Sequence, residues 1–194
     1  MNTDTAGVAG PRRNLPQMGA DIAGLSVGDD GSRVCYIGED AHVYLDWSGV
    51  GGWHTVDLSS ATNAPLFGGK GLAIFEAGPQ ELRVCYVDRD SHVQMLHSEG
   101  QAWRIADLTQ LTGAGLVHQT TPLGGFSSKA GEWRVCYIGV DFHVHMLLVS
   151  AGRFYAWDLT EMSGAKVTVA SSSQLAVFAS ASLWRVGYLG SDGH

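Results

Sequence analysis

The chain repeats one segment four times at a spacing of about 50 residues. In three copies the segment opens with Arg-Val-Cys-Tyr and closes with Asp-x-His-Val, as in residues 33–43, and the fourth reads Arg-Val-Gly-Tyr and Asp-x-His. The opening arginines are 50, 51 and 51 residues apart, and the closing histidines keep the same steps: Arg33, Arg83, Arg134 and Arg185, with His42, His92, His143 and His194. Self-similarity at such a period indicates a solenoid, a propeller or an array of modules.

Each complete unit contains four short runs rich in Val, Ile, Tyr, Phe and Trp, bounded by Gly, Asp and Ser. Such runs are typical of β-strands, and 26 glycines with only 16% charged residues favour a turn-rich β protein. The predicted strands are 21–27, 33–38, 42–47 and 53–58; then 71–77, 82–88, 92–97 and 103–108; then 122–127, 133–139, 143–149 and 154–159; and finally 174–179 and 184–190.

Four antiparallel strands in about 50 residues make one blade of a β-propeller. We therefore predict an all-β fold, a β-propeller of four-stranded antiparallel blades, with about 3.5 blades in this chain. Blades 1 to 3 span about 20–58, 71–108 and 121–159, and a half blade 4 spans 173–194, all within a repeat region 16–194 that follows a disordered tail, 1–15. A β-sandwich is the alternative, but it does not predict such regular repetition.

Side-chain alternation and capping residues refine this prediction. Alternation along the second strand places Val34 and Tyr36 on one face and Arg33, Cys35 and Ile37 on the other. After each fourth strand comes Asp-Leu followed by Ser or Thr, with Asn or Gly four residues further on. This pattern predicts a helical turn with a Ser or Thr cap, and the acids Asp57, Asp107 and Asp158 are interpreted as capping the loop.

Charge and hydropathy argue against several classes of partner. The net charge of -7 and the pI of about 5.5 argue against a nucleic-acid surface. No apolar run approaches the roughly 20 residues that span a bilayer, so we expect no membrane span. Residues 1–16 are polar and lack the apolar core of a signal peptide, so the expected location is cytoplasmic, or exported without a Sec signal peptide.

The recurrent cysteines, histidines and acids occur once per blade. We expect Cys35, Cys85 and Cys136 to be buried, reduced core residues, because equivalent atoms of neighbouring blades are too far apart for a disulfide. His42, His92 and His143 each follow an aspartate by two residues, but ligands of one metal should converge, so we assign them to turns and strand starts. No nucleophile motif occurs within a blade. The chain is therefore predicted to be no enzyme and to need no metal or cofactor.

The blade sequence resembles the fucose-binding lectin propellers of fungi and bacteria, the Aleuria aurantia lectin type. Leu72-Ala73-Ile74-Phe75, Arg83-Val84-Cys85-Tyr86, Asp90-Ser91-His92-Val93 and Trp103 follow the order of that family's blade, and the resemblance covers residues 20–194. It implies a non-catalytic, carbohydrate-binding propeller with glycans, of fucose type, in clefts between blades. An arginine and a glutamate of one blade would bond the hydroxyls, and an aromatic residue of the next would pack on the sugar.

The resemblance carries over to candidate sugar-binding residues: Arg33, Arg83, Arg134 and Arg185, with Trp53, Trp103 and Phe154. Arg33 would act with Trp103, and Arg83 with Phe154. Where the family has glutamate, this chain has Leu45, Met95 and Met146, and Asp46 could substitute only through a one-residue register shift. Losing a charged acceptor costs about 1.5–3 kcal/mol, roughly ten- to a hundred-fold in affinity.

Two questions stay open from the sequence. The alternative function is a protein-interaction or structural propeller that has lost sugar binding. Three and a half blades do not close a ring, so we expect either a homo-oligomer or further blades that complete it.

Overall fold

The computed structural model describes residues 15–17, 21–26, 31–49, 51–100, 102–129, 131–165, 168–170, 173–180 and 183–194. The predicted tail lies outside the described residues except for Leu15, as does Val27 at the end of the first predicted strand.

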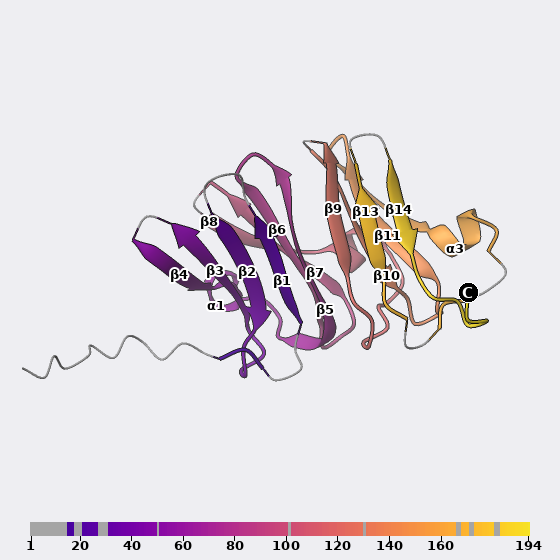
Figure 1. The fold of residues 1–194 in the computed structure, drawn as a ribbon, viewed down its shortest axis with the longest axis horizontal. Helices are drawn as coiled ribbons and strands as arrows, with labels where there is room; N and C mark the ends of the chain where they lie inside the picture. The colour runs from indigo at the N-terminus through magenta and orange to yellow at the C-terminus, as the bar shows by residue number, and fades with distance from the viewer. Residues whose placement is uncertain are drawn as a thin grey trace, which may run out of the picture.

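Three four-stranded antiparallel sheets and a two-stranded one follow each other along the chain (Figure 1). Every strand in the first three sheets pairs with its neighbour in sequence. Blade 1 contains β1 (Ile22–Ser26), β2 (Ser32–Ile37), β3 (Val43–Gly49) and β4 (Gly52–Asp57); blade 2 contains β5 (Phe67–Gly78), β6 (Glu81–Asp88), β7 (Val93–Glu99) and β8 (Ala102–Asp107); blade 3 contains β9 (Gly124–Lys129), β10 (Glu132–Ile138), β11 (Val144–Ser150) and β12 (Arg153–Asp158); and blade 4 contains β13 (Ala176–Ala179) and β14 (Trp184–Gly187). The predicted incomplete β-propeller of about 3.5 blades is confirmed.

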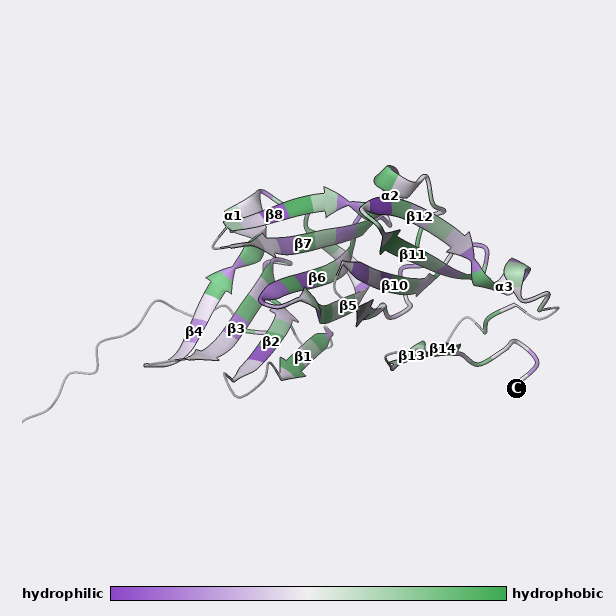
Figure 2. Cartoon of the chain, turned by 90° about the horizontal axis from the view of Figure 1, so that it is seen from above, coloured by the Kyte–Doolittle hydropathy of each residue, from purple (hydrophilic) through white to green (hydrophobic). Residues whose placement is uncertain are grey.

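The blades are arranged around their first strands. β1, β5, β9 and β13 are neighbours in space, and β4, β8 and β12 lie furthest from them (Figure 2). The inner strands approach closely: a Cβ added to Gly125 of β9 would lie 2.5 Å from the ring of Phe75 on β5. The small residues of the first strands therefore allow the blades to pack around an axis.

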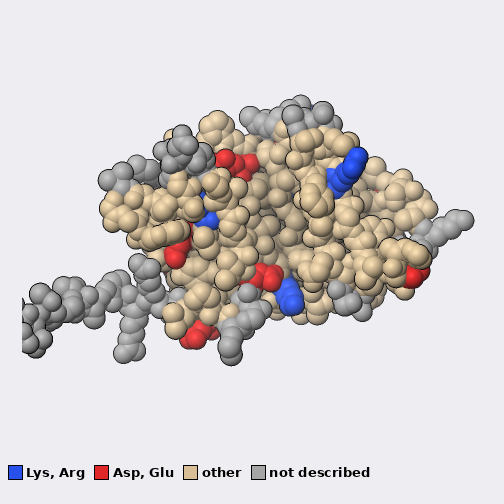
Figure 3. Space-filling model, in the orientation of Figure 1, with Lys and Arg blue, Asp and Glu red and all other residues tan. Residues whose placement is uncertain are grey.

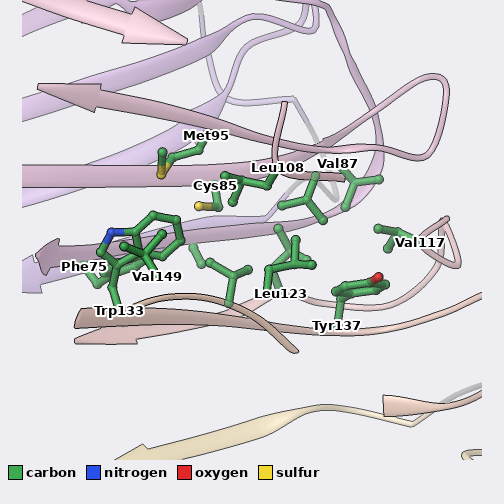
Figure 4. Packing of buried hydrophobic residues seen from close by; sticks show 14 of the residues in the cluster. Phe75, Cys85, Val87, Met95, Leu108, Val117, Leu123, Trp133, Tyr137 and Val149 are labelled. Atoms are coloured by element: carbon green, nitrogen blue, oxygen red, sulfur yellow. The ribbon is translucent and has the colours of Figure 1, made fainter. Parts of the chain in front are cut away.

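The hydrophobic core lies between blades. Cys35 and Ile37 of blade 1 pack with Val84 and Tyr86 of blade 2, so the predicted alternation of faces is confirmed. The other face of blade 2 packs against blade 3 through a set that includes Phe75, Cys85, Met95, Trp133, Tyr137 and Val149 (Figure 4). Each strand buries alternate side chains on opposite faces of its sheet, so one sheet contributes to two cores.

A short helix follows each complete blade: α1 (Leu58–Thr62), α2 (Leu108–Thr112) and α3 (Leu159–Met162). The predicted Ser or Thr cap is wrong, because the N-cap is the preceding aspartate, whose carboxylate accepts an N–H of the first turn from Ser60, Gln110 or Glu161. The hydroxyls of Ser59, Thr109 and Thr160 instead accept the buried N–H groups of Val43, Val93 and Val144, each at 2.9 Å. The hydroxyl thus ties the helix to the third strand.

Backbone hydrogen bonds connect successive blades. The N–H groups of Phe67, Val117 and Val169 donate to the carbonyls of Ala41, Ser91 and Phe142 in the preceding blade, at 2.9–3.0 Å. These three acceptors have φ between 61° and 66°, a left-handed conformation that non-glycine residues adopt rarely. The turn after each second strand therefore holds an unusual backbone geometry in the same place in every complete blade.

The burial of the cysteines agrees with the expectation from the sequence. Cys35, Cys85 and Cys136 are free and fully buried, and burial raises the pKa of the Cys136 thiol to about 12. On the face seen in Figure 3, acidic and basic side chains are scattered among uncharged residues. Among the described residues, no helix has the length and apolar character that crossing a membrane requires.

Candidate functional site

A pocket of about 400 Å³ lies between blades 1 and 2. It brings together Arg33 of β2 and Trp103 of β8, the pair expected to act together. Its lining comes from both blades: Arg33, Leu45, Trp47 and Val56 from blade 1, and Gln80, Leu82, Ser98, Gly100 and Trp103 from blade 2. We call this pocket the blade 1–2 cleft.

Only part of the Arg33 guanidinium is hydrogen-bonded to the described residues. Its Nη1 donates to the backbone carbonyls of Ser32 and Ser48, both at 3.3 Å. Its Nε and Nη2 groups make no hydrogen bond to the described residues. Since arginine offers five N–H donors in a fixed plane, Arg33 retains donors for a ligand in the cleft.

Among the described residues, none of those that line the blade 1–2 cleft carries a carboxylate. Leu45, at the position of the expected acid, is 3% exposed and lies opposite Cys35 in the sheet. Asp46 lies opposite Val34 and therefore on the other face, so no register shift brings it into the cleft. The polar groups that join Arg33 there are neutral, those of Gln80 and Ser98.

The interface between blades 2 and 3 is filled differently. Arg83 forms an ion pair with Glu81 at 3.1 Å and donates to the carbonyl of Leu82 at 3.1 Å. The indole of Trp133, 5% exposed, contacts both Phe75 and Phe154 with ring centroids 6.2 Å apart in each case. Phe154 thus packs edge-on against a core tryptophan, and Met95 is buried in the same cluster.

The interface between blades 3 and 4 is also occupied by an aromatic residue. The guanidinium of Arg134 lies 5.8 Å from the ring centroids of both Phe126 and Trp184. It also donates to Ser128 Oγ at 2.7 Å, and Glu132 lies 3.9 Å away. Met146, at the position of the expected acid, is fully buried. Arg134 therefore has partners within the protein on several sides.

The structure does not bring the last two predicted residues together with others of the set. Trp53 lies on β4 and is half exposed. Arg185 of β14 lines a second pocket of about 480 Å³ beside α3, together with Trp184, Leu159 and Met162. That pocket contains none of the other predicted sugar-binding residues.

A signal that separates Arg33 from Arg83 and Arg134 was present in the sequence. Two residues before the arginine stand Gly31, Glu81 and Glu132, and alternation places such a residue on the arginine's own face. The residue directly before the arginine is Ser32, Leu82, Trp133 or Trp184. Arg33 thus has no carboxylate two residues before it on its own strand, whereas Arg83 and Arg134 both have one.

Each complete blade also contains a histidine–aspartate pair that sequence reasoning missed. The histidine directly before the third strand places Nδ1 at 2.6–2.9 Å from the aspartate that caps the helix: His42 with Asp57, His92 with Asp107, and His143 with Asp158. The hydrogen bond to Asp107 raises the pKa of His92, and the bond to Asp158 raises the pKa of His143. The predicted position at a strand start is confirmed, and its partner lies 15 residues further along the chain.

Comparison with known proteins places the fold. No protein-family model matches the chain, and no curated protein matches it. The structure of Aleuria aurantia lectin, a six-bladed β-propeller with a novel fucose recognition mode, matches with a TM-score of 0.69 at 17% identity. The chain has the fold of the Aleuria aurantia lectin type of propeller. The match covers 89% of this chain and 55% of the lectin, so the chain spans little more than half of that lectin's length.

Two other solved structures give the same result. AofleA from Arthrobotrys oligospora matches with a TM-score of 0.55 at 13% identity, covering 87% of this chain and 49% of that one. SapL1 lectin in complex with alpha methyl fucoside matches with a TM-score of 0.51 at 17% identity, covering 91% and 80% of the two chains. At these identities the likeness defines the architecture, and the site has to be argued from this chain's own residues.

Proposed function

We propose that the chain is a non-catalytic carbohydrate-binding propeller and that the blade 1–2 cleft is its glycan site. One observation carries the proposal: the cleft joins an arginine with unused donors to two tryptophans at the junction of two blades. Several solved structures of this fold are lectins, and two of them hold alpha-methyl fucoside.

The chemistry of the cleft suits a monosaccharide ring. The unused N–H groups of Arg33 are donors to sugar hydroxyl oxygens, and the planes of Trp103 and Trp47 cover ring C–H groups and a methyl substituent. The side-chain amide of Gln80 supplies a neutral acceptor for a hydroxyl proton. A 6-deoxyhexose such as fucose offers both a polar edge and an apolar methyl, so we propose a fucose-type ligand.

The neutral lining sets the expected strength of binding. A hydrogen bond to a charged acceptor contributes about 1.5–3 kcal/mol and one between neutral groups about 0.5–1.5 kcal/mol. Gln80 in place of a carboxylate therefore predicts roughly tenfold weaker binding than a cleft with a glutamate acceptor. Association of several chains, or further blades, would compensate through avidity.

Calorimetric titration of the purified chain with methyl α-L-fucoside, together with a glycan array, tests this function. We expect Arg33→Ala and Trp103→Ala to abolish binding, because each removes one wall of the cleft. Arg83→Ala is the matched control, since this arginine is engaged by Glu81 and should leave binding unchanged.

The outcomes separate the candidates. A glycan signal that is lost in Arg33→Ala and Trp103→Ala but kept in Arg83→Ala supports the blade 1–2 cleft. A signal that depends equally on Arg83 would contradict the choice of cleft. An absence of any glycan signal from a folded chain would contradict the lectin function and favour a protein-interaction propeller.

A further inference from the structure

One blade differs from the others in its polar side chains. Asp141, His145 and Asp158 of blade 3 each offer one ligand atom, and these atoms all lie within 4.8 Å of one another. Asp141 belongs to the turn after β10, His145 to β11, and Asp158 ends β12. Three segments separated along the chain therefore place one imidazole and two carboxylates in a single cluster, which we call the blade 3 triad.

The distance between the ligand atoms of His145 and Asp141 suits a metal ion. His145 Nε2 lies 3.0 Å from Asp141 Oδ1 and 3.1 Å from Asp141 Oδ2. Zinc binds imidazole nitrogen and carboxylate oxygen at about 2.0–2.2 Å, so two tetrahedral ligands of one ion lie about 3.4 Å apart. His145 Nε2 and the Asp141 oxygens therefore need to move apart by only a few tenths of an ångström to become ligands of one ion.

The side chains of the triad are held in place by the protein. Asp141 Oδ1 accepts the backbone N–H of His143 at 3.1 Å, and Asp158 Oδ1 accepts that of Glu161 at 2.9 Å. The ring of His145 is stacked on Tyr137, with centroids 5.2 Å apart and an interplanar angle of 19°. Side chains oriented by such partners lose little freedom when a ligand binds.

Asp158 also has the outer partner that a metal-bound carboxylate commonly has. His143 Nδ1 lies 2.6 Å from Asp158 Oδ2, and each carboxylate oxygen has a further lone pair available. The exposed fraction of the side chain is 13% for His145, 21% for Asp158 and 50% for Asp141. The nitrogen ligand is therefore sheltered, while one side of the cluster is open to water and to an ion.

The other two complete blades lack this combination. The position of His145 is taken by Tyr44 in blade 1 and by Gln94 in blade 2. Tyr44 donates to Asp40 at 2.8 Å, and Gln94 donates to Asp88, the last residue of β6, at 2.8 Å. All three side chains therefore bond an acid at the end of the second strand or in the turn that follows it. Only in blade 3 is that side chain an imidazole, which binds transition metals.

We propose that Asp141, His145 and Asp158 bind a divalent transition-metal ion of the Zn²⁺ type, with water completing the coordination. One nitrogen and two oxygen ligands suit Zn²⁺ and its neighbours, whereas Ca²⁺ and Mg²⁺ prefer sets made of oxygen alone. Binding would displace the proton that His145 shares with Asp141, since the metal takes the nitrogen lone pair. The three cysteines do not compete in the folded chain, because all three are buried in the cores between the blades.

The test is equilibrium dialysis of the chelator-treated full chain against ZnCl₂, with bound metal measured by mass spectrometry. We expect about one zinc ion per chain. His145→Gln removes the ligand and introduces the side chain that blade 2 has at this position, and it should weaken zinc binding by at least about tenfold. Asp141→Asn should also weaken zinc binding, so the conclusion does not depend on the folding of a single variant.

The matched control is His42→Gln in blade 1, which alters the corresponding histidine–aspartate pair without touching the triad. It should bind zinc as the unchanged chain does. A second readout is the visible absorption of bound Co²⁺, which reports nitrogen and oxygen ligation directly and should disappear in His145→Gln.

Three results would overturn the proposal: no zinc bound to the folded chain, zinc binding that His145→Gln leaves intact, or Ca²⁺ binding as tight as that of Zn²⁺. Because the triad and the blade 1–2 cleft belong to different blades, loss of glycan binding in Arg33→Ala would leave zinc binding unaffected. The two proposals therefore fail independently.

Discussion

At the scale of single residues, the strongest contrast lies between arginines in equivalent positions. Gly31 lies two residues before Arg33, whereas Glu81 and Glu132 lie two residues before Arg83 and Arg134. Both glutamates lie within ion-pair distance of their arginine. An arginine paired inside its own strand gives up donors and freedom of movement. We infer that blades with the same fold do not all carry the same binding site.

The pair of His92 and Asp107 makes a prediction about pH. The hydrogen bond to Asp107 raises the pKa of His92 above the ordinary value of 6.5, so the folded state binds the proton more tightly than the unfolded chain. This contribution to stability is fully present below about pH 6.5 and is lost as the pH rises through the raised pKa.

Urea unfolding of the unchanged chain and of His92→Gln between about pH 6 and pH 9 measures the contribution of this pair to stability. The stability difference between the two proteins should shrink as the pH increases. A difference that stays constant over this window would show that the pair acts only as a neutral hydrogen bond.

At the level of residues, the sequence indicated contacts along a strand but not contacts that depend on the distance between sheets. The pairing of Arg33 with Trp103 was implied by the resemblance to the lectin propellers, and both residues line the blade 1–2 cleft. The ion pair of Arg83 with Glu81 was also readable, since residues two apart share a face. The filling of the second interface by Trp133 was not, because it depends on how closely two sheets approach.

At the scale of the elements, strand positions were predictable within a few residues because turn residues bound each apolar run. The capping of the helices was predicted on the wrong residue. Asp107 and Thr109 both suit an N-cap by residue type, and only the fold shows that Thr109 is needed elsewhere, at the buried N–H of Val93. Tertiary hydrogen bonding thus decides between two local solutions.

Thr109→Val tests this link between α2 and β7. The change leaves the N–H of Val93 buried without an acceptor, which should lower the free energy of unfolding by about 1–3 kcal/mol. Thr109→Ser keeps the hydroxyl and should cost much less. Chemical denaturation of both variants gives the comparison, and equal losses would mean that the methyl group rather than the hydroxyl matters.

At the scale of the whole molecule, the spacing of the blades is set by close approach of the first strands. Gly125 of β9 lies against Phe75 of β5, and an added Cβ would come within 2.5 Å of that ring. The period of the repeat predicted the propeller, but how tightly neighbouring blades approach depends on contacts between residues about 50 positions apart.

Gly125→Ala should therefore force two blades apart and lower stability by about 1–3 kcal/mol, as overpacking of a close-packed core does. Gly115→Ala is the matched control, because an added Cβ at Gly115 meets no atom within 4 Å. Thermal unfolding of the two variants should separate them clearly. Equal melting temperatures would mean that the blades tolerate a wider spacing.

The interchange of Tyr44, Gln94 and His145 has a consequence for how such a protein can change. Three different side chains satisfy a similar requirement, a hydrogen bond to an acid at the end of the second strand or in the turn that follows it. A repeat can therefore acquire new chemistry in one copy while the other copies, and that copy's own hydrogen bond, keep the architecture intact. For protein engineering, this position can carry hydrogen-bond donors of different kinds in different blades without a redesign of the rest of the propeller.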